Sequence, residues 1–216
     1  MEVDEAELAA LYTTLDADVA AAVASFELPS VRIQPTEACD ADAAVTRFGG
    51  VPLVGMGFAW PTKDDGRPLS LIGQWRCDEL NRWIGEQLLP ADSLLCFFFD
   101  VEEEAGWGLT PQDVRGWRVT VHRAFGWPEP QQNPMHLDCQ LVSNGRELTA
   151  AGYRDPRVPD LQADAAGWQL LWQVDTDLHG LGIEWMWGDM GKLYFWIRSE
   201  DLAIGRFDRV WVLLQG

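Results

Sequence analysis

The spacing of apolar residues predicts one helix at the start of the chain and strands through most of the rest. From Asp4 to about Phe26, apolar side chains recur every three or four residues and form one face of an amphipathic helix. This face consists of Leu8, Leu11, Leu15, Val19 and Val23. Leu28-Pro29 is expected to end the helix. We expect the helix to pack on the core, and docking to a partner protein is the alternative.

Strand patterns follow this helix. Val31–Gln34 alternates between apolar and polar residues, as a half-buried strand does. The nearly continuous apolar run from Ser93 to Val101 indicates a strand covered on both faces. Further strands are predicted at 68–75, 117–122, 139–142, 168–174, 192–198 and 209–214, with a short helix at 77–87. Asn144-Gly145 predicts a hairpin turn.

Glycine and proline residues mark the loops. An ordered loop is expected from Phe48 to Pro61, with Trp60 as a plug, and a turn at Asp64-Asp65-Gly66. Residues 125–134 and 151–166 are predicted to form surface loops.

The two halves of the chain resemble each other at an offset of about one hundred residues. Leu71-Ile72-Gly73-Gln74 corresponds to Leu170-Leu171-Trp172-Gln173, and 95–98 corresponds to 193–196. We therefore predict an internal duplication, with related halves at about 45–125 and 150–216. The predicted fold class is α+β: an N-terminal helix in residues 1–30, and one domain from 31 to 216 with two mainly antiparallel sheets.

Several short motifs, in this order and spacing, resemble the YwqG-like bacterial family of unknown function. They are Phe48-Gly49-Gly50-Val51-Pro52, Trp60-Pro61, Pro68-Leu69 with Leu71 and Gln74, Leu89-Pro90, Phe97-Phe98 and Trp187-Gly188-Asp189. The resemblance covers roughly residues 45 to 215. It implies an α+β fold of mostly antiparallel sheet with related halves. Some members lie beside secreted toxins, which implies a role as immunity proteins.

Charge narrows the choice of partners. The chain has 34 acidic and 16 basic side chains, a net charge of −18, which argues against binding to nucleic acid or to anionic lipid. A basic protein such as a toxin is the expected partner. Glu102, Glu103 and Glu104 are the candidate partner-binding residues, because a run of like charges can speed association with a basic surface. The alternatives are a solvated loop and an acidity that reflects the coding genome.

The compartment is predicted from the chain start and the cysteines. The acidic start, Met1 to Glu5, lacks the features of a signal peptide, and no apolar run is long enough to span a membrane. The four cysteines are widely spaced, which favours free thiols in a cytoplasmic protein.

No complete catalytic motif is recognisable, so no catalytic residue, metal or cofactor is predicted. Asp175-Thr176-Asp177 is interpreted as a turn, with a divalent-cation site as the alternative. Aromatic and polar residues could instead line a crevice between the two halves. This candidate ligand site contains Trp60, Gln74, Gln173, Asp175, Trp185, Trp187 and Asp189.

The sequence thus leaves two hypotheses about function. The first is a non-catalytic binding protein, specifically an immunity protein against a toxin. The second is a small-ligand binder or enzyme that uses the crevice, which a meeting of Gln74 and Gln173 in one pocket would support.

Overall fold

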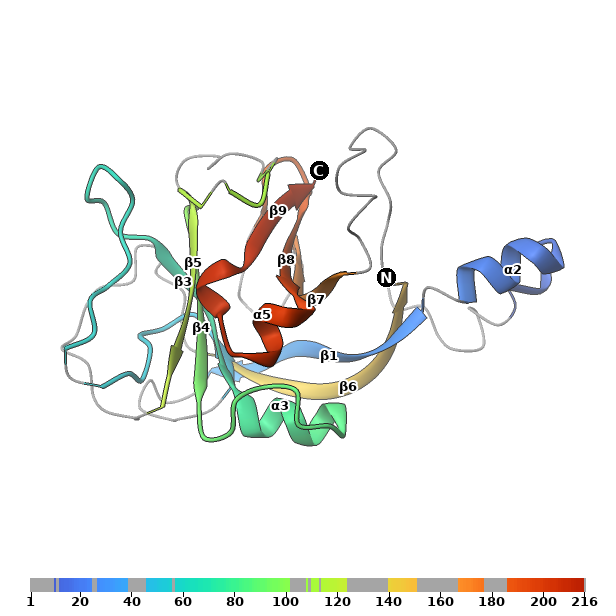
Figure 1. The fold of residues 1–216 in the computed structure, drawn as a ribbon, viewed down its shortest axis with the longest axis horizontal. Helices are drawn as coiled ribbons and strands as arrows, with labels where there is room; N and C mark the ends of the chain where they lie inside the picture. The colour runs from blue at the N-terminus through green and yellow to red at the C-terminus, as the bar shows by residue number, and fades with distance from the viewer. Residues whose placement is uncertain are drawn as a thin grey trace.

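Two antiparallel sheets pack face to face, with short helices between the strands (Figure 1). The structure is a computed structural model of the 216-residue chain. It describes residues 10, 12–24, 27–38, 46–55, 57–101, 108, 110–112, 114–123, 140–150, 167–176 and 186–215. The predicted loops at 125–134 and 151–166 lie outside these ranges.

In chain order, the described elements comprise several strands and a few short helices. They are α2 (Ala17–Ala24), β1 (Glu27–Ala38), β2 (Arg47–Phe48), β3 (Ser70–Arg76), α3 (Cys77–Ile84), β4 (Leu94–Phe99), β5 (Trp117–His122), β6 (Gln140–Ala150), β7 (Trp168–Asp175), β8 (Lys192–Arg198), α5 (Ser199–Ala203), the 3₁₀ helix η2 (Phe207–Arg209) and β9 (Trp211–Gln215). The larger sheet has the order β1-β6-β2-β3-β4-β5, and the smaller sheet has the order β7-β8-β9. The predicted α+β fold with two antiparallel sheets is confirmed.

Matching irregularities identify β3-β4-β5 and β7-β8-β9 as two copies of one unit. The pairing of β3 with β4 skips Ile72, and the pairing of β7 with β8 skips Leu171. β-bulges are usually conserved among related structures, so a bulge shared by two units indicates that the units are related. The two bulges occupy equivalent positions in the two halves.

The turns that lead into β4 and β8 match as well. Asp92 and Met190, at equivalent positions, have left-handed φ angles of 50° and 61°, and they are the non-glycine residues with positive φ in the described part of the chain. Directly after β3, the N–H of Cys77 donates to the Ser93 carbonyl at 3.0 Å. After β7, the N–H of Thr176 donates to the Gly191 carbonyl at 3.2 Å. The two units share the bulge, the turn and the hydrogen bond, and this supports the predicted internal duplication.

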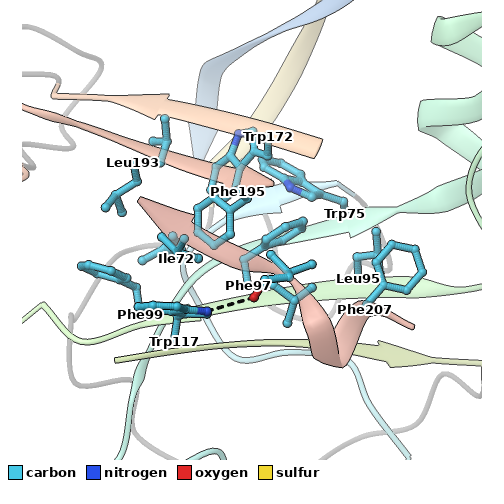
Figure 2. Packing of buried hydrophobic residues seen from close by; sticks show 14 of the residues in the cluster. Ile72, Trp75, Leu95, Phe97, Phe99, Trp117, Trp172, Leu193, Phe195 and Phe207 are labelled. Carbon is cyan, nitrogen blue, oxygen red and sulfur yellow. Dashed lines mark hydrogen bonds between the residues drawn. The ribbon is translucent and has the colours of Figure 1, made fainter. Parts of the chain in front are cut away.

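Equivalent strands of the two units face one another across an aromatic core (Figure 2). Trp172 of β7 lies at the centre of the contact, with its ring 4.8 Å from Trp75 and 5.1 Å from Phe195. One strand further along, Phe97 of β4 meets Phe195 of β8 at 5.2 Å. The Trp172–Phe195 rings are stacked and the other two pairs meet edge to face, and both arrangements add to the free energy gained by burial. The space between the halves, where a crevice was expected, is therefore occupied by the hydrophobic core.

The N-terminal helix differs from the prediction. Instead of one helix ending near Pro29, the described residues form a short helical turn before Thr14 and then α2. The Thr13 hydroxyl donates to the Ala10 carbonyl, a bond that competes with helix continuation, and Asp16 precedes α2 where aspartate favours a helix start. Val19 is 48% exposed, and α2 lies beyond the end of the β1–β6 pair (Figure 1). The expected packing of this apolar face on the core is thus not observed for Val19.

β1 and β6 are also longer than predicted. Pro29, which was expected to end the N-terminal helix, lies within β1, as does Pro35. Proline is tolerated there because β1 is the edge strand of its sheet. The predicted hairpin turn at Asn144-Gly145 is wrong, because β6 continues through it and pairs with β1 at Ile33 and Arg32. A distant strand thus overrides the local turn preference.

Candidate functional site

The outer face of the smaller sheet presents aromatic and polar side chains. Side chains alternate along β8: Leu193, Phe195 and Ile197 are buried in the core. The residues between them point to the other face and are only half-buried. These outward residues are Lys192, Tyr194, Trp196 and Arg198.

Neighbouring strands extend this face on both sides of Tyr194. Gln173 of β7 pairs with Tyr194 and is exposed, and Leu213 of β9 pairs with it from the other side and is half-buried. Leu170 is the partner of Trp196 in the same way. We call the resulting surface the β8 strip. Its centre is formed by Tyr194 and Trp196, which are flanked by Leu170, Gln173 and Leu213.

Charged groups lie at both ends of the β8 strip. At one end, Lys192 donates to Asp175 across a 2.7 Å salt bridge, and this bond raises the pKa of Lys192. The pair is about half-exposed, so it contributes little to stability. At the other end, the Arg198 guanidinium lies 4.6 Å from the centre of the Trp168 ring. Burial raises the pKa of Tyr194, so its hydroxyl stays protonated at neutral pH.

Trp187 is a buried anchor of the turn before β8, and its side chain does not form an exposed platform. Its indole N–H donates to the Asp175 carbonyl at 3.2 Å, and its backbone N–H donates to Thr176 Oγ1 at 3.1 Å. Met186 and Met190 project from the turn, 55% and 56% exposed, and Asp189 is also exposed. Trp185 lies outside the described residues.

The duplication explains why Trp187 is buried. Leu89 holds the equivalent position before β4 and is buried too. Its backbone N–H also donates to a polar side chain, Asn81 Oδ1, at 2.9 Å. The Leu89-Pro90 and Trp187-Gly188 motifs therefore mark one repeated turn, which was not recognisable from the sequence as a pair.

Gln74 and Gln173 point to opposite outer faces of the sandwich and do not meet. Their neighbours Trp75 and Trp172 point into the core, and side chains alternate along a strand. Gln74 is fully buried, and its Oε1 accepts the N–H of Leu53 at 2.8 Å. Gln173 is exposed. The shared pocket expected for these two residues is therefore not formed by them.

A covering loop lies over the outer face of the larger sheet, where Gln74 points. Gly49 and Gly50, with φ of 62° and 72°, turn the chain back over the sheet. The buried Arg47 guanidinium donates to the Val51 carbonyl and ties the loop down. Further along, Trp60 plugs this loop as predicted: its indole N–H donates to the Leu69 carbonyl at 2.7 Å. Trp60 thus lies on the opposite side of the molecule from the β8 strip.

The predicted turn at Asp64-Asp65-Gly66 is confirmed, since the N–H of Gly66 donates to the Lys63 carbonyl at 2.9 Å. The turn places Lys63 next to Asp100, which follows β4, and the two side chains form a buried salt bridge of 3.1 Å. No sequence pattern indicated this pair, because Lys63 lies in a loop. The pair joins the covering loop to the sheet.

The described cysteines, Cys77 and Cys96, are buried and free of disulfides. Burial raises the pKa of Cys77 to about 12, and it raises the pKa of Cys96 as well. Since the thiolate is the reactive form, neither is suited to nucleophilic catalysis. Cys39 and Cys139 lie outside the described residues.

We predict that a thiol-alkylating reagent at pH 8 leaves Cys77 and Cys96 unmodified in the native protein. Both should react fully after denaturation, because unfolding exposes the thiols and restores their ordinary pKa. Peptide mass spectrometry of samples alkylated before and after unfolding measures this. Alkylation of Cys96 in the native protein at the rate of an unfolded thiol would contradict the prediction.

Other candidate chemistry can be located only in part. Among the described residues, no three His, Cys, Asp or Glu side chains are grouped to hold a metal ion. Glu102, Glu103 and Glu104, and also Asp177, lie outside those residues. No helix in the described ranges is long and apolar enough to cross a membrane.

Comparison with known proteins gives a family without a known activity. The profile of a domain of unknown function, DUF1963, matches residues 46–121 and again 119–216. No curated protein matched the chain. Two matches in one chain agree with the two structural units described above. Because the matches together extend from residue 46 to residue 216, the chain belongs to the DUF1963 family, a domain of unknown function.

Proposed function

We propose that this protein is a non-catalytic binding protein for a basic protein partner, and that the β8 strip is its contact surface. The observation that carries the proposal is the pair of half-buried aromatic residues, Tyr194 and Trp196, on the outer face of a sheet whose inner face is core. Tyrosine and tryptophan are enriched at the centres of protein interfaces, where they bury a large area at low entropic cost.

Acidic side chains lie near the strip. Exposed Asp189 and Glu200 lie next to the smaller sheet, whereas Asp175 is bound in a salt bridge. The net charge of −18 adds a long-range attraction for a basic protein. An apolar centre with a charged rim is the usual arrangement of a protein interface. Met186 and Met190 add flexible apolar contacts beside it.

The YwqG-like resemblance suggests a more specific form of this proposal. A cytoplasmic immunity protein would cover a toxin, and a toxin that cleaves nucleic acid needs a basic surface. The net negative charge of the chain complements that surface. Glu102, Glu103 and Glu104 would then add to the attraction before contact.

The test is binding to a purified basic partner protein, for which a toxin encoded next to this chain's gene is the first candidate to seek, measured by biolayer interferometry. We expect Trp196→Ala to weaken binding about 30-fold, because central aromatic residues commonly contribute 2 kcal/mol or more. Phe58→Ala is the matched control, since Phe58 is a half-buried aromatic residue on the opposite face. It should leave affinity unchanged.

The charge part of the proposal has its own measurement. Replacing Glu102, Glu103 and Glu104 with glutamine should slow association and leave dissociation nearly unchanged, because peripheral charges steer more than they anchor. Equal affinity of Trp196→Ala and the unaltered protein would remove the β8 strip from the interface. An association rate indifferent to salt would show that acidity plays no part.

A further inference from the structure

The strand β7 has an open edge. It pairs with β8 on one side and is the outermost strand of the smaller sheet. Within the described part of the chain, the backbone of residues 170–174 makes hydrogen bonds to β8 alone. In an antiparallel strand, every second residue directs its N–H and C=O away from the paired neighbour. β7 therefore presents unused donors and acceptors on its outer edge.

This edge lacks most of the protection that edge strands carry. Residues 168–174 contain no charged residue and no proline, although the bulge at Leu171 interrupts the strand. Natural edge strands usually carry lysine, proline or a bulge that discourages pairing with another chain. The two residues that follow the bulge, Trp172 and Gln173, are the regular part of the edge.

Beyond the open edge of β7, the larger sheet extends further than the smaller sheet. β7 lies against β3, since Trp172 contacts Trp75, and β8 lies against β4 through Phe195 and Phe97. The larger sheet continues past β3 with β2, β6 and β1. No described strand of the smaller sheet faces these three. A strand added to β7 would lie over β2, near Phe48, whose ring is 6.1 Å from Trp172.

The duplication shows what such a strand would resemble. In the first unit, the edge of β3 is paired with β2: Arg47 is opposite Gln74, and Phe48 is opposite Gly73. The positions equivalent to Gln74 and Gly73 in the second unit are Gln173 and Trp172. The first unit therefore fills, from its own chain, the position that the second unit leaves open.

We propose that β7 accepts one extended segment of a partner protein, added antiparallel beside Trp172 and Gln173. The side chain next to Trp172 must be apolar because it faces the core, and the residue next to Gln173 faces solvent and can be basic. In β2, Phe48 and Arg47 occupy the core face and the outer face in the same order, although Arg47 is buried beneath the covering loop. Adding a strand at a sheet edge is an established mode of peptide recognition.

A second copy of this chain does not fit the same edge. Antiparallel pairing of β7 with its own copy would place both larger sheets on one side of the joined sheet. The second larger sheet would then occupy the space of β2 and β6, which extend past β7 on that side. The width of the larger sheet thus selects a single strand. This inference does not rest on the proposed function, because it needs no basic toxin and no contact with the β8 strip.

The test uses a peptide copied from the first unit. It is an acetylated and amidated peptide with the sequence of residues 43–52, which contains Arg47 and Phe48. Hydrogen exchange of the full-length protein is followed by NMR with and without the peptide. At a peptide concentration ten times its dissociation constant, we expect the outward amide among Trp172 and Gln173 to exchange about tenfold more slowly. The matched control is the same peptide N-methylated at the arginine and phenylalanine, which removes the donors and should abolish the protection.

Each other outcome overturns the proposal. Absence of protection at β7 would show that the edge does not take this strand. Equal protection by the N-methylated peptide would show contact without backbone pairing. If the outward amides of β7 already exchange as slowly as those of β8 before peptide is added, the edge is closed in solution by the chain itself. None of these results would alter the outcome expected for Trp196→Ala.

Discussion

Gly108→Ala is expected to destabilise the protein by about 3 kcal/mol or more, combining overpacking with the strain of a left-handed backbone. A Cβ at this position would lie 1.8 Å from the carbonyl oxygen of Val212 in β9. Gly108 also has a φ of 62°, which other residues rarely adopt. Urea denaturation followed by tryptophan fluorescence measures the loss.

The clash at Gly108 is hard to relieve because both sides are held. The indole N–H of Trp211 donates to the Gly108 carbonyl at 2.6 Å, and Val212 is paired with Phe195 in the sheet. Gly205→Ala is the matched control: its φ is 73°, but nothing lies within 4 Å of an added Cβ. It should cost about 1 to 2 kcal/mol from backbone strain alone. Equal losses in the two variants would show that the approach to β9 is unimportant.

Sequence patterns predicted the strands of the repeated unit well, because the order of apolar and polar residues within each strand is enough to indicate it. The strand predicted at 192–198 and the apolar run at 93–101 correspond to β8 and β4, and the strand predicted at 117–122 has the bounds of β5. β1 and β6 were predicted too short because each owes its length to the other. Their pairing joins residues more than one hundred positions apart, which no local pattern reveals.

The candidate site was predictable only in part, and the reason is orientation. Gln173 and Asp175 are exposed as a surface site requires, whereas Gln74 and Trp187 are buried and hydrogen-bonded to backbone. A residue type does not show which face of a strand it occupies once a bulge intervenes, as at Leu171. Tyr194 was missed for a different reason: the strand at 192–198 was predicted without assigning its two faces, although the alternation of Tyr194 with apolar neighbours is visible in the sequence.

Trp172→Ala should cost about 3 to 5 kcal/mol, the range for deleting a large aromatic side chain from a core. Trp172 lies at the centre of the contact between the second unit and the first. Its ring lies 4.8 Å from Trp75, 4.9 Å from Phe97 and 6.1 Å from Phe48. The loss should therefore weaken the contact between the sheets as well as the local packing.

Gln173→Ala is the matched control on the adjacent residue of the same strand. Gln173 is exposed and faces away from the core, so its truncation should change the free energy of unfolding by less than about 0.5 kcal/mol. Denaturation curves of the two variants, recorded by far-UV circular dichroism, compare the two faces of β7 directly. A loss at Gln173 as large as that at Trp172 would contradict the face-to-face packing. A separate early transition in Trp172→Ala alone would instead show that the two units, although they share one core, can unfold in turn.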